Sequence, residues 1–580
     1  MTHESLKKIA EAAYSFDFSE VKIIDADTVF LEITPESITI GGASVPQKLR
    51  ALSLAYLNRD KKTLSLHQRP NFNSLGVMID MSRGCVMKPE KVKEFITKIA
   101  LCGANRFMLY TEDTYTLEEY PHLGYLRGRY TDEELRDIDH YAFELGVEVV
   151  PCIQTLGHMA QYLTWSTETA GIKDTDGVLL CGSEKTYRFI EASIKKMSSL
   201  FRSRRIHIGM DEAHDMGLGN FLKENGYRDR ITVMTEHISH VSELCQKYGL
   251  QPMMWSDMLF KLQSGNTALD SYYASVNTVS SLNIAGMDPV YWDYYHKDQS
   301  HYTERILAHQ NLGGSTVFAG TVYTTRGFLP NYKLTFETCI PGLKACIANG
   351  ISEVLATMWG DDGCETNYFD ALYGFAAYSE LCYNSDASMA DIELMGEAIS
   401  GISPELAATI NRFFILDRPK FLMWGDIFYQ ISGVDFSTRE DYLALEQLAE
   451  NCDHRYVQLL LRIMFTRASL YADLQKKYAS GESLCHYIDT VFPQLLADYR
   501  ELYQMHSDIW LSVNKAFGYE VLQSRYATTI NRIEYALKIL TEYVSGERTH
   551  IEELEYRPLY GQTRTPFYNY IAFSRVMDFN

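Results

Sequence analysis

Several marks of other protein classes are missing from this sequence of 580 residues. No segment reaches the roughly 18 uninterrupted apolar residues that a membrane span needs, and the N-terminal stretch lacks the apolar core of a secretory signal. The eleven cysteines are an odd number, scattered from Cys85 to Cys485 with no CxxC pair. This is the pattern of reduced, mostly buried thiols, so neither a disulfide framework nor a zinc site is expected. These absences predict a cytoplasmic protein.

A surplus of positive charge is missing as well. The 54 lysines and arginines stand against 75 aspartates and glutamates, which gives a formal net charge of −21. A chain this acidic repels phosphate backbones and anionic lipids, so neither nucleic acid nor a membrane is expected as a partner. We expect a small-molecule substrate that is neutral or weakly charged.

An apolar strand, a polar loop and an amphipathic helix alternate through the middle of the chain. Eight such strands with helical crossovers predict an α/β fold, a (β/α)8 TIM barrel, over residues 74–385. A doubly wound sheet is the competing solution, but it would carry a glycine-rich phosphate turn after its first strand, and Met81-Ser82-Arg83-Gly84 is not one. The expected strands are Gly76–Met81, Arg106–Thr111, Val147–Gln154, Arg205–Met210, Gln251–Ser256, Pro289–Tyr294, Val317–Tyr323 and Glu353–Trp359.

Two further domains are expected beside the barrel, because a chain of this length exceeds a single core. Residues 1–73 mix a helix with short β-like runs and predict a small α/β domain. Strand-like patterning fades after residue 385, and tyrosine and leucine at helical spacing predict an all-helical domain over residues 386–580. Its expected helices are Arg439–Asn451, Arg455–Tyr478, Tyr487–Phe517 and Ile530–Tyr543.

The most informative stretch is an apolar strand that ends in two adjacent carboxylates, Asp211 and Glu212. In a (β/α)8 barrel the active-site groups lie at the C-terminal ends of the strands. Aromatic faces cover the C–H patches of a sugar ring while charged groups hold its hydroxyls, so the residues at these strand ends point to a carbohydrate site. They are Asp80, Arg83, His158, Asp211, Glu212, Trp255, Asp257, Tyr291, Asp293, Tyr323, Trp359 and Asp361.

Each of these residues also has a purely structural interpretation. Arg83 can form an ion pair with Asp80, and His158 and His207 can be core histidines with satisfied hydrogen bonds. A single tryptophan is more often core than pocket, but the clustering of four at or beyond strand ends favours a pocket. The four are Trp165, Trp255, Trp292 and Trp359.

A metal site is not expected, although His207, Asp211, His214 and Asp215 resemble a ligand cluster. His207 and Asp211 are four residues apart on a strand, which separates them by roughly 13 Å, too far to share one ion. The HExxH motif is absent. No cofactor is expected either.

The stretch from His207 to Glu212 resembles the His-x-Gly-x-Asp-Glu signature of family 20 glycoside hydrolases, the β-N-acetylhexosaminidases. The helical C-terminal region and the missing signal peptide are similar to the streptococcal-type intracellular β-N-acetylglucosaminidases of that family. Three residues depart from the family pattern. Met210 stands where the family usually has Gly or Ala, Leu156 where it often has Pro, and Tyr323 where Trp is common. Further stretches that resemble family motifs, in the family's order, are Asp80–Arg83, Leu156–His158, Tyr291–Asp293, Phe318–Tyr323 and Trp359–Asp361.

The resemblance implies an exo-acting, retaining hydrolase of carbohydrate metabolism that removes terminal GlcNAc, or also GalNAc, from glycans. The attacking group would be the substrate's own 2-acetamido oxygen. Glu212 would be the general acid, and Asp211 would orient the acetamido group and stabilise an oxazolinium intermediate. The other implied roles fall to Tyr291 at the acetamido oxygen, Trp255, Tyr323 and Trp359 as walls, Arg83, Asp293 and Asp361 at the outer hydroxyls, His158 beside the substrate, and His207 behind the site.

Two other functions remain open. An O-GlcNAcase-like or chitinase-like barrel glycosidase would share the acetamido chemistry, although a chitinase would carry a DxxDxDxE strand, which is absent. A non-catalytic sugar-binding barrel would be expected to have lost Asp211, Glu212 or Arg83, and all three are present.

The helical region contains an aromatic run from Phe421 to Tyr429 that is too apolar for a solvated loop. One interpretation is packing inside its own domain. The alternative places Trp424 at a subunit interface, where it completes a pocket rim, and on this basis we expect a homodimer.

Overall fold

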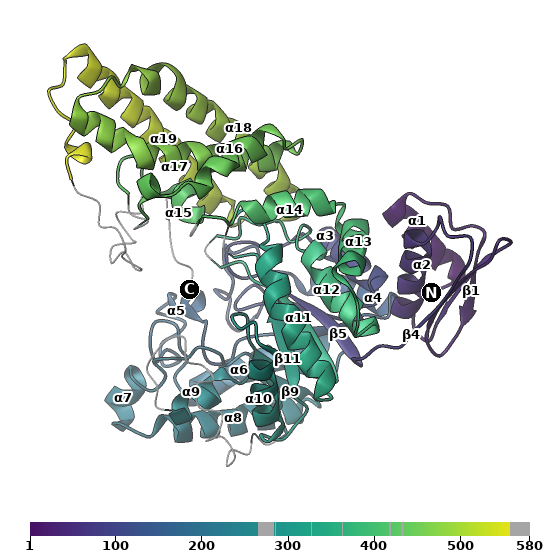
Figure 1. The fold of residues 1–580 in the computed structure, drawn as a ribbon. Coiled ribbons are helices and arrows are strands. Elements are labelled where there is room, and N and C mark those ends of the chain that lie inside the picture. The colour runs from purple at the N-terminus through teal and green to yellow at the C-terminus, as the bar shows by residue number, and fades with distance from the viewer. Residues whose placement is uncertain are drawn as a thin grey trace.

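The computed structural model describes residues 1–264, 284, 286–325, 327–361, 363–416, 419–430 and 434–556. A small sheet, a closed barrel and a helical region follow one another along the chain (Figure 1). The barrel lies in the middle, with the N-terminal sheet on one side and the helical region on another (Figure 1). None of the described helices is long and apolar enough to cross a lipid bilayer.

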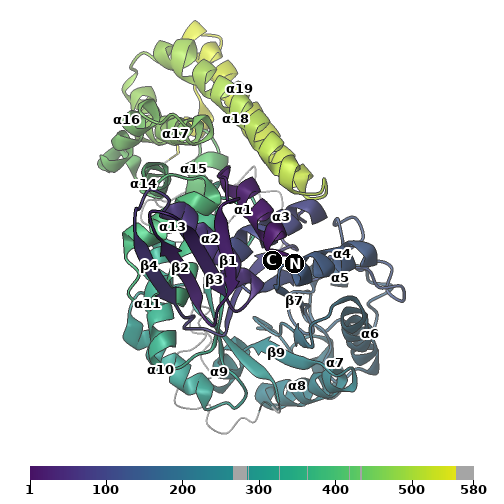
Figure 2. The same cartoon turned by 90° about the vertical axis from the view of Figure 1, so that its right-hand side faces the viewer.

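A four-stranded sheet with two helices forms the N-terminal part, and Figure 2 looks onto this sheet. The strand order is β1-β3-β2-β4, with β3 parallel to β1 and antiparallel to β2. Alternate residues of β2 are buried, as a sheet with one covered face requires. The bounds are α1 His3–Tyr14, β1 Val21–Asp25, β2 Val29–Ile33, β3 Ile38–Gly42, α2 Val45–Leu57 and β4 Leu64–Gln68.

Eight parallel strands close into a barrel, so the expected (β/α)8 fold is confirmed and the doubly wound sheet is excluded. Each expected strand is present, with ends that differ by a few residues. The strands are β5 Ser74–Asp80, β6 Arg106–Tyr110, β7 Glu148–Cys152, β8 Arg205–His207, β9 Gln251–Trp255, β10 Asp288–Trp292, β11 Val317–Thr321 and β12 Glu353–Met358. The main surrounding helices are α3 Pro89–Leu101, α4 Asp132–Glu144, α6 Glu184–Leu200, α8 Arg230–Lys247, α10 Gln299–Gln310, α11 Tyr332–Ala348 and α12 Leu372–Tyr383.

Alternate side chains of these strands fill the barrel interior. Strand β10 contributes Val290 and Trp292 to the interior cluster. Tyr291, between them, points outward and stacks on His309 with 4.7 Å between the ring centroids. This alternation decides which residues reach the mouth of the barrel.

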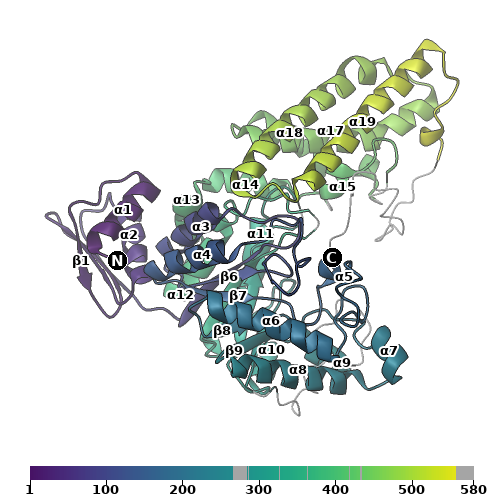
Figure 3. The same ribbon diagram turned by 180° about the vertical axis from the view of Figure 1, so that it is seen from behind.

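The C-terminal region is helical, and its long helices α17, α18 and α19 pack side by side (Figure 3). The expected helix over 439–451 is only partly present, because short 3₁₀ turns precede α16. The expected helix over 487–517 begins with a π-turn and ends at Val513. The bounds are α13 Met389–Ser400, α14 Pro404–Arg412, α15 Pro419–Trp424, α16 Ala444–Glu450, α17 Arg455–Ser480, α18 Phe492–Val513 and α19 Tyr519–Ser545.

Trp424 packs inside its own chain, which is the first of the two interpretations that the sequence allows. Its side chain is buried, and its indole Nε1 donates a hydrogen bond to Glu365 Oε1 over 2.9 Å. Its ring packs on Phe328, with 5.0 Å between centroids. Contacts within one chain therefore account for the burial of Trp424, and the alternative at a subunit interface stays a prediction.

Candidate functional site

An open pocket of about 700 Å³, measured with its mouth, lies at the C-terminal ends of the barrel strands. The structure brings together here the expected residues Arg83, Asp211, Glu212, Trp255, Tyr323, Trp359 and Asp361. Trp292, one of the four tryptophans expected near a pocket, also lines it, and the structure adds Tyr294, Tyr295, Thr321 and Thr325.

The two adjacent carboxylates sit on a turn with unusual backbone angles. Met210 and Glu212 have φ values of 76° and 50°, a region that residues other than glycine adopt only where the surroundings enforce it. Gly209 also has a positive φ, and a Cβ atom there would come within 2.0 Å of Gln154 Oε1. The glycine of the motif therefore makes room for Gln154, whose Nε2 donates to Asp211 Oδ1 over 2.8 Å.

His158 lies between the two carboxylates. Its Nε2 is 3.1 Å from Asp211 Oδ2 and 3.5 Å from Glu212 Oε2. Burial opposes ionisation of Asp211, but His158 and the Gln154 amide hold its pKa at about 2. Burial also opposes a charged imidazole, yet Asp211 raises the pKa of His158 well above its ordinary value. Asp211 is therefore an ionised carboxylate at neutral pH.

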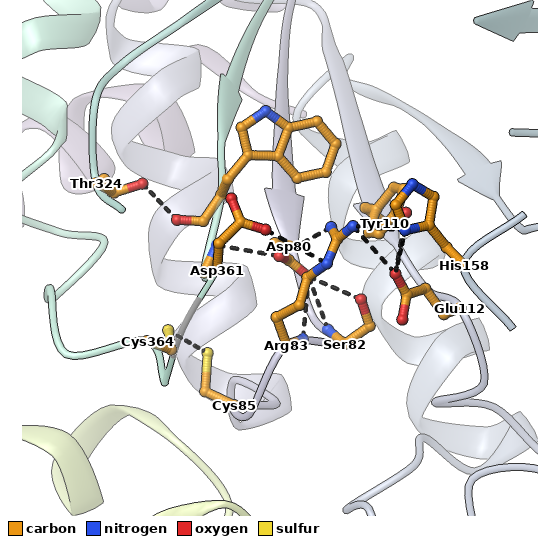
Figure 4. Close-up of polar contacts among 12 residues, drawn as sticks. Asp80, Ser82, Arg83, Cys85, Tyr110, Glu112, His158, Thr324, Asp361 and Cys364 are labelled. Atoms are coloured by element: carbon orange, nitrogen blue, oxygen red, sulfur yellow. Dashed lines mark hydrogen bonds and ion pairs between the residues drawn. The ribbon is translucent and has the colours of Figure 1, made fainter. Parts of the chain in front are cut away.

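Arg83 contacts three carboxylates at once (Figure 4). Its guanidinium nitrogens lie 3.3 Å from Asp80, 3.2 Å from Glu112 and 3.5 Å from Asp361. The guanidinium also lies over the ring of Trp359, 5.3 Å from the centroid. Both interpretations of Arg83 hold, because it forms the structural ion pair with Asp80 and also lines the pocket.

Tryptophan rings form the pocket walls. Trp255 and Trp359 lie 6.1 Å apart between centroids, at an interplanar angle of 54°. His207 packs behind Trp255 at 4.4 Å, and its Nδ1 accepts a hydrogen bond from the Gly209 N–H. Burial lowers the pKa of His207 to about 3, so it is a neutral ring that supports the wall.

The structure does not bring Tyr291 and Asp293 to this pocket. Tyr291 faces outward, and its hydroxyl donates to Asp293 Oδ2 over 2.9 Å. From the sequence, the first and third residues of the Tyr-Trp-Asp motif are expected in the pocket. Side chains alternate along β10, however, and it is Trp292 and Tyr294 that face inward. Trp165 is also outside the pocket lining, since it packs on a histidine ring of a neighbouring loop at 4.7 Å.

Asp293 instead gathers two histidines. His296 Nδ1 and His301 Nε2 lie 2.8 Å and 3.1 Å from its Oδ2. Among the described residues these three form a cluster of possible metal ligands, with the ligand atoms all within 4.8 Å. The two imidazole rings, however, stack at 3.4 Å with an interplanar angle of 16°. A metal ion lies near the plane of each imidazole that binds it, so the stacked rings cannot share an ion without rotating, and we assign the cluster to loop stabilisation.

Two buried carboxylates near the pocket have roles that the sequence pattern does not assign. Glu112 forms an ion pair with Arg83. The positive charge of Arg83 lowers the pKa of Glu112, but burial has the larger effect and raises it to about 7. It follows the second barrel strand, so the strand-end rule could have found it. Asp257 is expected at a strand end, but without a role. Its Oδ2 accepts the backbone N–H of Glu212 over 3.0 Å, and its Oδ1 accepts from Trp292 Nε1 over 3.2 Å.

We expect Asp257→Asn to reduce a loss of stability that the wild-type protein shows as the pH rises from about 4 to about 7. Burial, followed by the negative charge of Asp211, raises the pKa of Asp257 to about 7. An unfolded aspartate ionises near pH ~3.9. The folded state therefore holds this proton more tightly, and the resulting stability is complete below that pH and is lost as the pH rises through about 7. The loss is on the order of 4 kcal/mol for this one group. Melting temperatures of both proteins at intervals between about pH 4 and 8 measure it, and parallel curves would contradict the assignment.

Two family models match the chain. The model described as "Glycosyl hydrolase family 20, catalytic domain" matches residues 72–310. The model described as "Glycoside Hydrolase 20C C-terminal domain" matches residues 408–569. The first includes the turn that carries Asp211 and Glu212, and the second spans most of the helical region.

Curated relatives are similar over part of the chain. The beta-hexosaminidase of Porphyromonas gingivalis is 25% identical over 276 residues, which cover 40% of this chain and 35% of that protein. Human hexosaminidase D is 24% identical over 222 residues, which cover 37% of this chain and 43% of that protein. The chain therefore spans less than half the length of these relatives.

Solved structures share the fold. Flavobacterium johnsoniae chitobiase superposes with a TM-score of 0.52 at 16% identity, covering 94% of this chain and 88% of that one. The Streptomyces plicatus N-acetyl-beta-hexosaminidase in complex with Thio-NAglucal gives a TM-score of 0.51 at 16% identity, covering 70% and 90%. At these identities the likeness concerns the fold alone.

Proposed function

Because the chain belongs to glycoside hydrolase family 20, we propose that it is an exo-acting β-N-acetylhexosaminidase that removes terminal, non-reducing β-GlcNAc. The observation that carries the proposal is the pairing of an ionised Asp211 with Glu212 in one pocket walled by tryptophans. The names of the similar proteins, beta-hexosaminidase and hexosaminidase D, support the same activity.

In this proposal Glu212 protonates the departing glycosidic oxygen and then activates water. Its carboxyl group lines the pocket, partly exposed and 3.5 Å from His158 Nε2, so it can reach both the substrate and solvent. Asp257 fixes the backbone of this residue through the hydrogen bond from the Glu212 N–H. An acid that is already held in place loses little conformational entropy when the transition state forms.

Asp211 holds the acetamido N–H of the sugar and directs its oxygen at the anomeric carbon. The acetamido oxygen then forms a cyclic oxazolinium, and water opens it with net retention of configuration. A buried carboxylate whose pKa is about 2 stabilises the positive charge of that intermediate without having to lose a proton. Gln154 and His158 keep the carboxylate in one orientation.

Arg83 and Asp361 recognise the outer hydroxyls of the terminal sugar. Both line the pocket, and they form an ion pair with the Arg83 Nε 3.5 Å from Asp361 Oδ1. Charged groups that close one end of the pocket leave room for a single terminal residue, which makes the enzyme exo-acting. Trp255 and Trp359 supply the apolar faces for the ring and the acetamido methyl.

Hydrolysis of paired aryl β-GlcNAc, β-GalNAc and β-Glc substrates by the purified protein tests the function. We expect rapid release from β-GlcNAc and no measurable release from β-Glc, which lacks the internal nucleophile. The β-GalNAc rate gives the tolerance of the pocket for an inverted 4-hydroxyl. Equal rates on β-GlcNAc and β-Glc would refute acetamido participation, and release from neither acetamido sugar would refute the activity.

We expect Tyr294→Phe, and not Tyr291→Phe, to impair the enzyme. Tyr294 lines the pocket, and its hydroxyl interacts with Thr357 and Trp359 close to Asp211. It is thus the tyrosine placed to hold the acetamido oxygen, and losing that bond should lower kcat/KM about tenfold to a hundredfold. Tyr291→Phe removes the same atom from the outside of the barrel and should change kcat/KM less than threefold. The opposite order would restore Tyr291 to the site.

A homodimeric assembly and a cytoplasmic location are further parts of the proposal. The cysteines support the location, since ten of the eleven are buried free thiols, with only Cys485 exposed. Light scattering at micromolar concentration tests the assembly, and a mass near 66.4 kDa would indicate a monomer.

A further inference from the structure

Glu365 is a buried carboxylate at the junction of the barrel and the helical region. It follows the pocket residue Asp361 by four positions, and its side chain is 1% exposed. Lys420 Nζ lies 2.7 Å from its Oε2, Arg525 forms an ion pair with its Oε1, and Trp424 Nε1 donates to the same oxygen over 2.9 Å. Two helices of the C-terminal region, α15 and α19, therefore converge on one side chain of a barrel loop.

The backbone around Glu365 is held by a third helix. His506 Nε2 on α18 donates to the Glu365 carbonyl over 2.9 Å, and burial lowers the pKa of His506 to about 4, which keeps the imidazole neutral. Trp510 Nε1 donates to the neighbouring Cys364 carbonyl over 3.2 Å. A Cβ atom on Gly363 would come within 2.5 Å of Arg525 Nη1, so the guanidinium lies directly against this glycine. The loop and the helices are thus in contact through both side chains and main chain.

The same loop is tied to the barrel on its other side. The Gly360 N–H donates to Asp80 Oδ2 over 3.0 Å, and the Tyr368 hydroxyl donates to the Asp80 carbonyl over 3.0 Å. Asp361 lies between Gly360 and Glu365 in the chain, and its carboxylate pairs directly with Arg83 (Figure 4). Asp80 therefore anchors the start of the loop, and the Glu365 cluster anchors the stretch that follows Asp361.

The segment that follows Arg83 also meets the helical region. The Lys515 N–H donates to the Val86 carbonyl over 2.8 Å, and the Lys88 N–H donates to the Val513 carbonyl over 2.9 Å. The turn between α18 and α19 thus pairs with the chain just beyond Arg83. Both residues assigned to the outer hydroxyls, Arg83 and Asp361, sit on loops that the helical region supports.

We propose that Glu365 is a positioning residue: it fastens the helical region to the β12 loop and thereby sets Asp361 at its distance from Arg83. The inference rests on the proposed function, and it assigns recognition of the non-reducing end to two domains acting together. The carboxylate offsets the positive charges of the buried Arg525 and the largely buried Lys420 where the two helices meet the loop.

Glu365→Gln in the full-length enzyme tests the proposal. The variant keeps the shape and an acceptor for Trp424 but loses the charge that holds Lys420 and Arg525. We expect kcat/KM for a terminal β-GlcNAc substrate to fall at least tenfold. Lys420→Met is the milder second variant, since Arg525 and Trp424 still bind Glu365, and we expect about a threefold fall.

Asp426→Asn is the matched control. Asp426 is also a fully buried carboxylate of the helical region, and it pairs with Arg532 over 2.6 Å. Its side chain also accepts the backbone N–H groups of Phe428 and Tyr429, so these three contacts all stay within the helical region. We expect its melting temperature to fall by as much as that of Glu365→Gln while kcat/KM changes less than threefold. If Asp426→Asn loses as much activity as Glu365→Gln, the loss comes from general destabilisation, and Glu365 has no specific positioning role.

A double-mutant cycle with Asp361→Ala separates positioning from damage of other kinds. If Glu365 acts through Asp361, adding Glu365→Gln to Asp361→Ala costs no more than a further twofold. If the double variant is instead at least tenfold less active than Asp361→Ala alone, the two residues act independently and the proposal is overturned.

Hydrogen exchange distinguishes failure of this inference from failure of the proposed function. Glu365→Gln should speed amide exchange in residues 359–361 and 363–366 at least tenfold, and Asp426→Asn should leave that exchange unchanged. A wild-type enzyme that hydrolyses no acetamido sugar would refute the function, while this exchange pattern would still decide the anchoring. Unchanged exchange in Glu365→Gln would refute the anchoring in an active enzyme.

Discussion

Glu212→Gln is expected to remove nearly all activity on substrates whose leaving group is an alcohol or another sugar. Such leaving groups depart only when they are protonated, and Glu212 is the proposed proton donor. Loss of a general acid costs roughly a hundredfold to ten-thousandfold in rate. Dinitrophenyl β-GlcNAc, whose leaving group needs little protonation, should lose less than tenfold in the cyclisation step. The ratio of the two effects is the measurement.

Asp215→Asn is the matched control for this experiment. Asp215 is an exposed carboxylate three residues further along the same loop, so the substitution removes a nearby charge without touching the pocket lining. It should leave both substrates within twofold of wild type. Equal losses on both leaving-group classes in Glu212→Gln would contradict the acid role and would indicate that the residue serves binding. Binding of the GlcNAc product should change little, because Glu212 is partly exposed and its side chain is replaced by an isostere.

The barrel could be predicted from the sequence because its strands are continuous apolar runs that end at polar groups. That rule found Arg83, Asp211, Glu212 and Trp359 at one mouth. It failed at β10, where two aromatic residues and an acid follow one another and the pattern does not show which of them face inward. The alternation along the strand, Val290 and then Trp292, is the signal that decides it.

Other parts of the site depend on distances along the chain that no local pattern covers. Glu365 meets Arg525, 160 positions away, and nothing in either segment indicates the other. The role of Gly209 likewise depends on Gln154, which comes from a different strand. Sequence patterns place residues at an end of the barrel, whereas the partners that orient them follow from packing. Trp424 illustrates this limit, because its aromatic surroundings in the sequence suggest two roles, and the contacts that explain its burial come from the distant residues Glu365 and Phe328.

Asp211→Asn is expected to weaken catalysis and inhibition by an N-acetyl thiazoline to a similar degree. The thiazoline imitates the cyclised oxazolinium, so a group that stabilises the intermediate should bind the inhibitor for the same reason. Asp211 is ionised, with a pKa of about 2, and its buried carboxylate is held by Gln154 and His158. A fixed charge of this kind contributes about a hundredfold to a thousandfold. We expect kcat to fall and the inhibition constant to rise within that range.

The parallel between the two measurements is decisive, because a change in only one of them would place Asp211 elsewhere in the reaction. A fall in kcat without weaker thiazoline binding would assign Asp211 to a later step, such as opening of the ring by water. Weaker binding with kcat preserved would mean that the carboxylate contacts the acetamido group in the ground state only. Asp257→Asn serves as the control, since it replaces a buried carboxylate that bonds the Glu212 backbone and does not line the pocket. If Asp257→Asn raises the inhibition constant as much as Asp211→Asn does, the effect comes from the charge of the whole cluster, and the specific contact between Asp211 and the acetamido nitrogen is refuted.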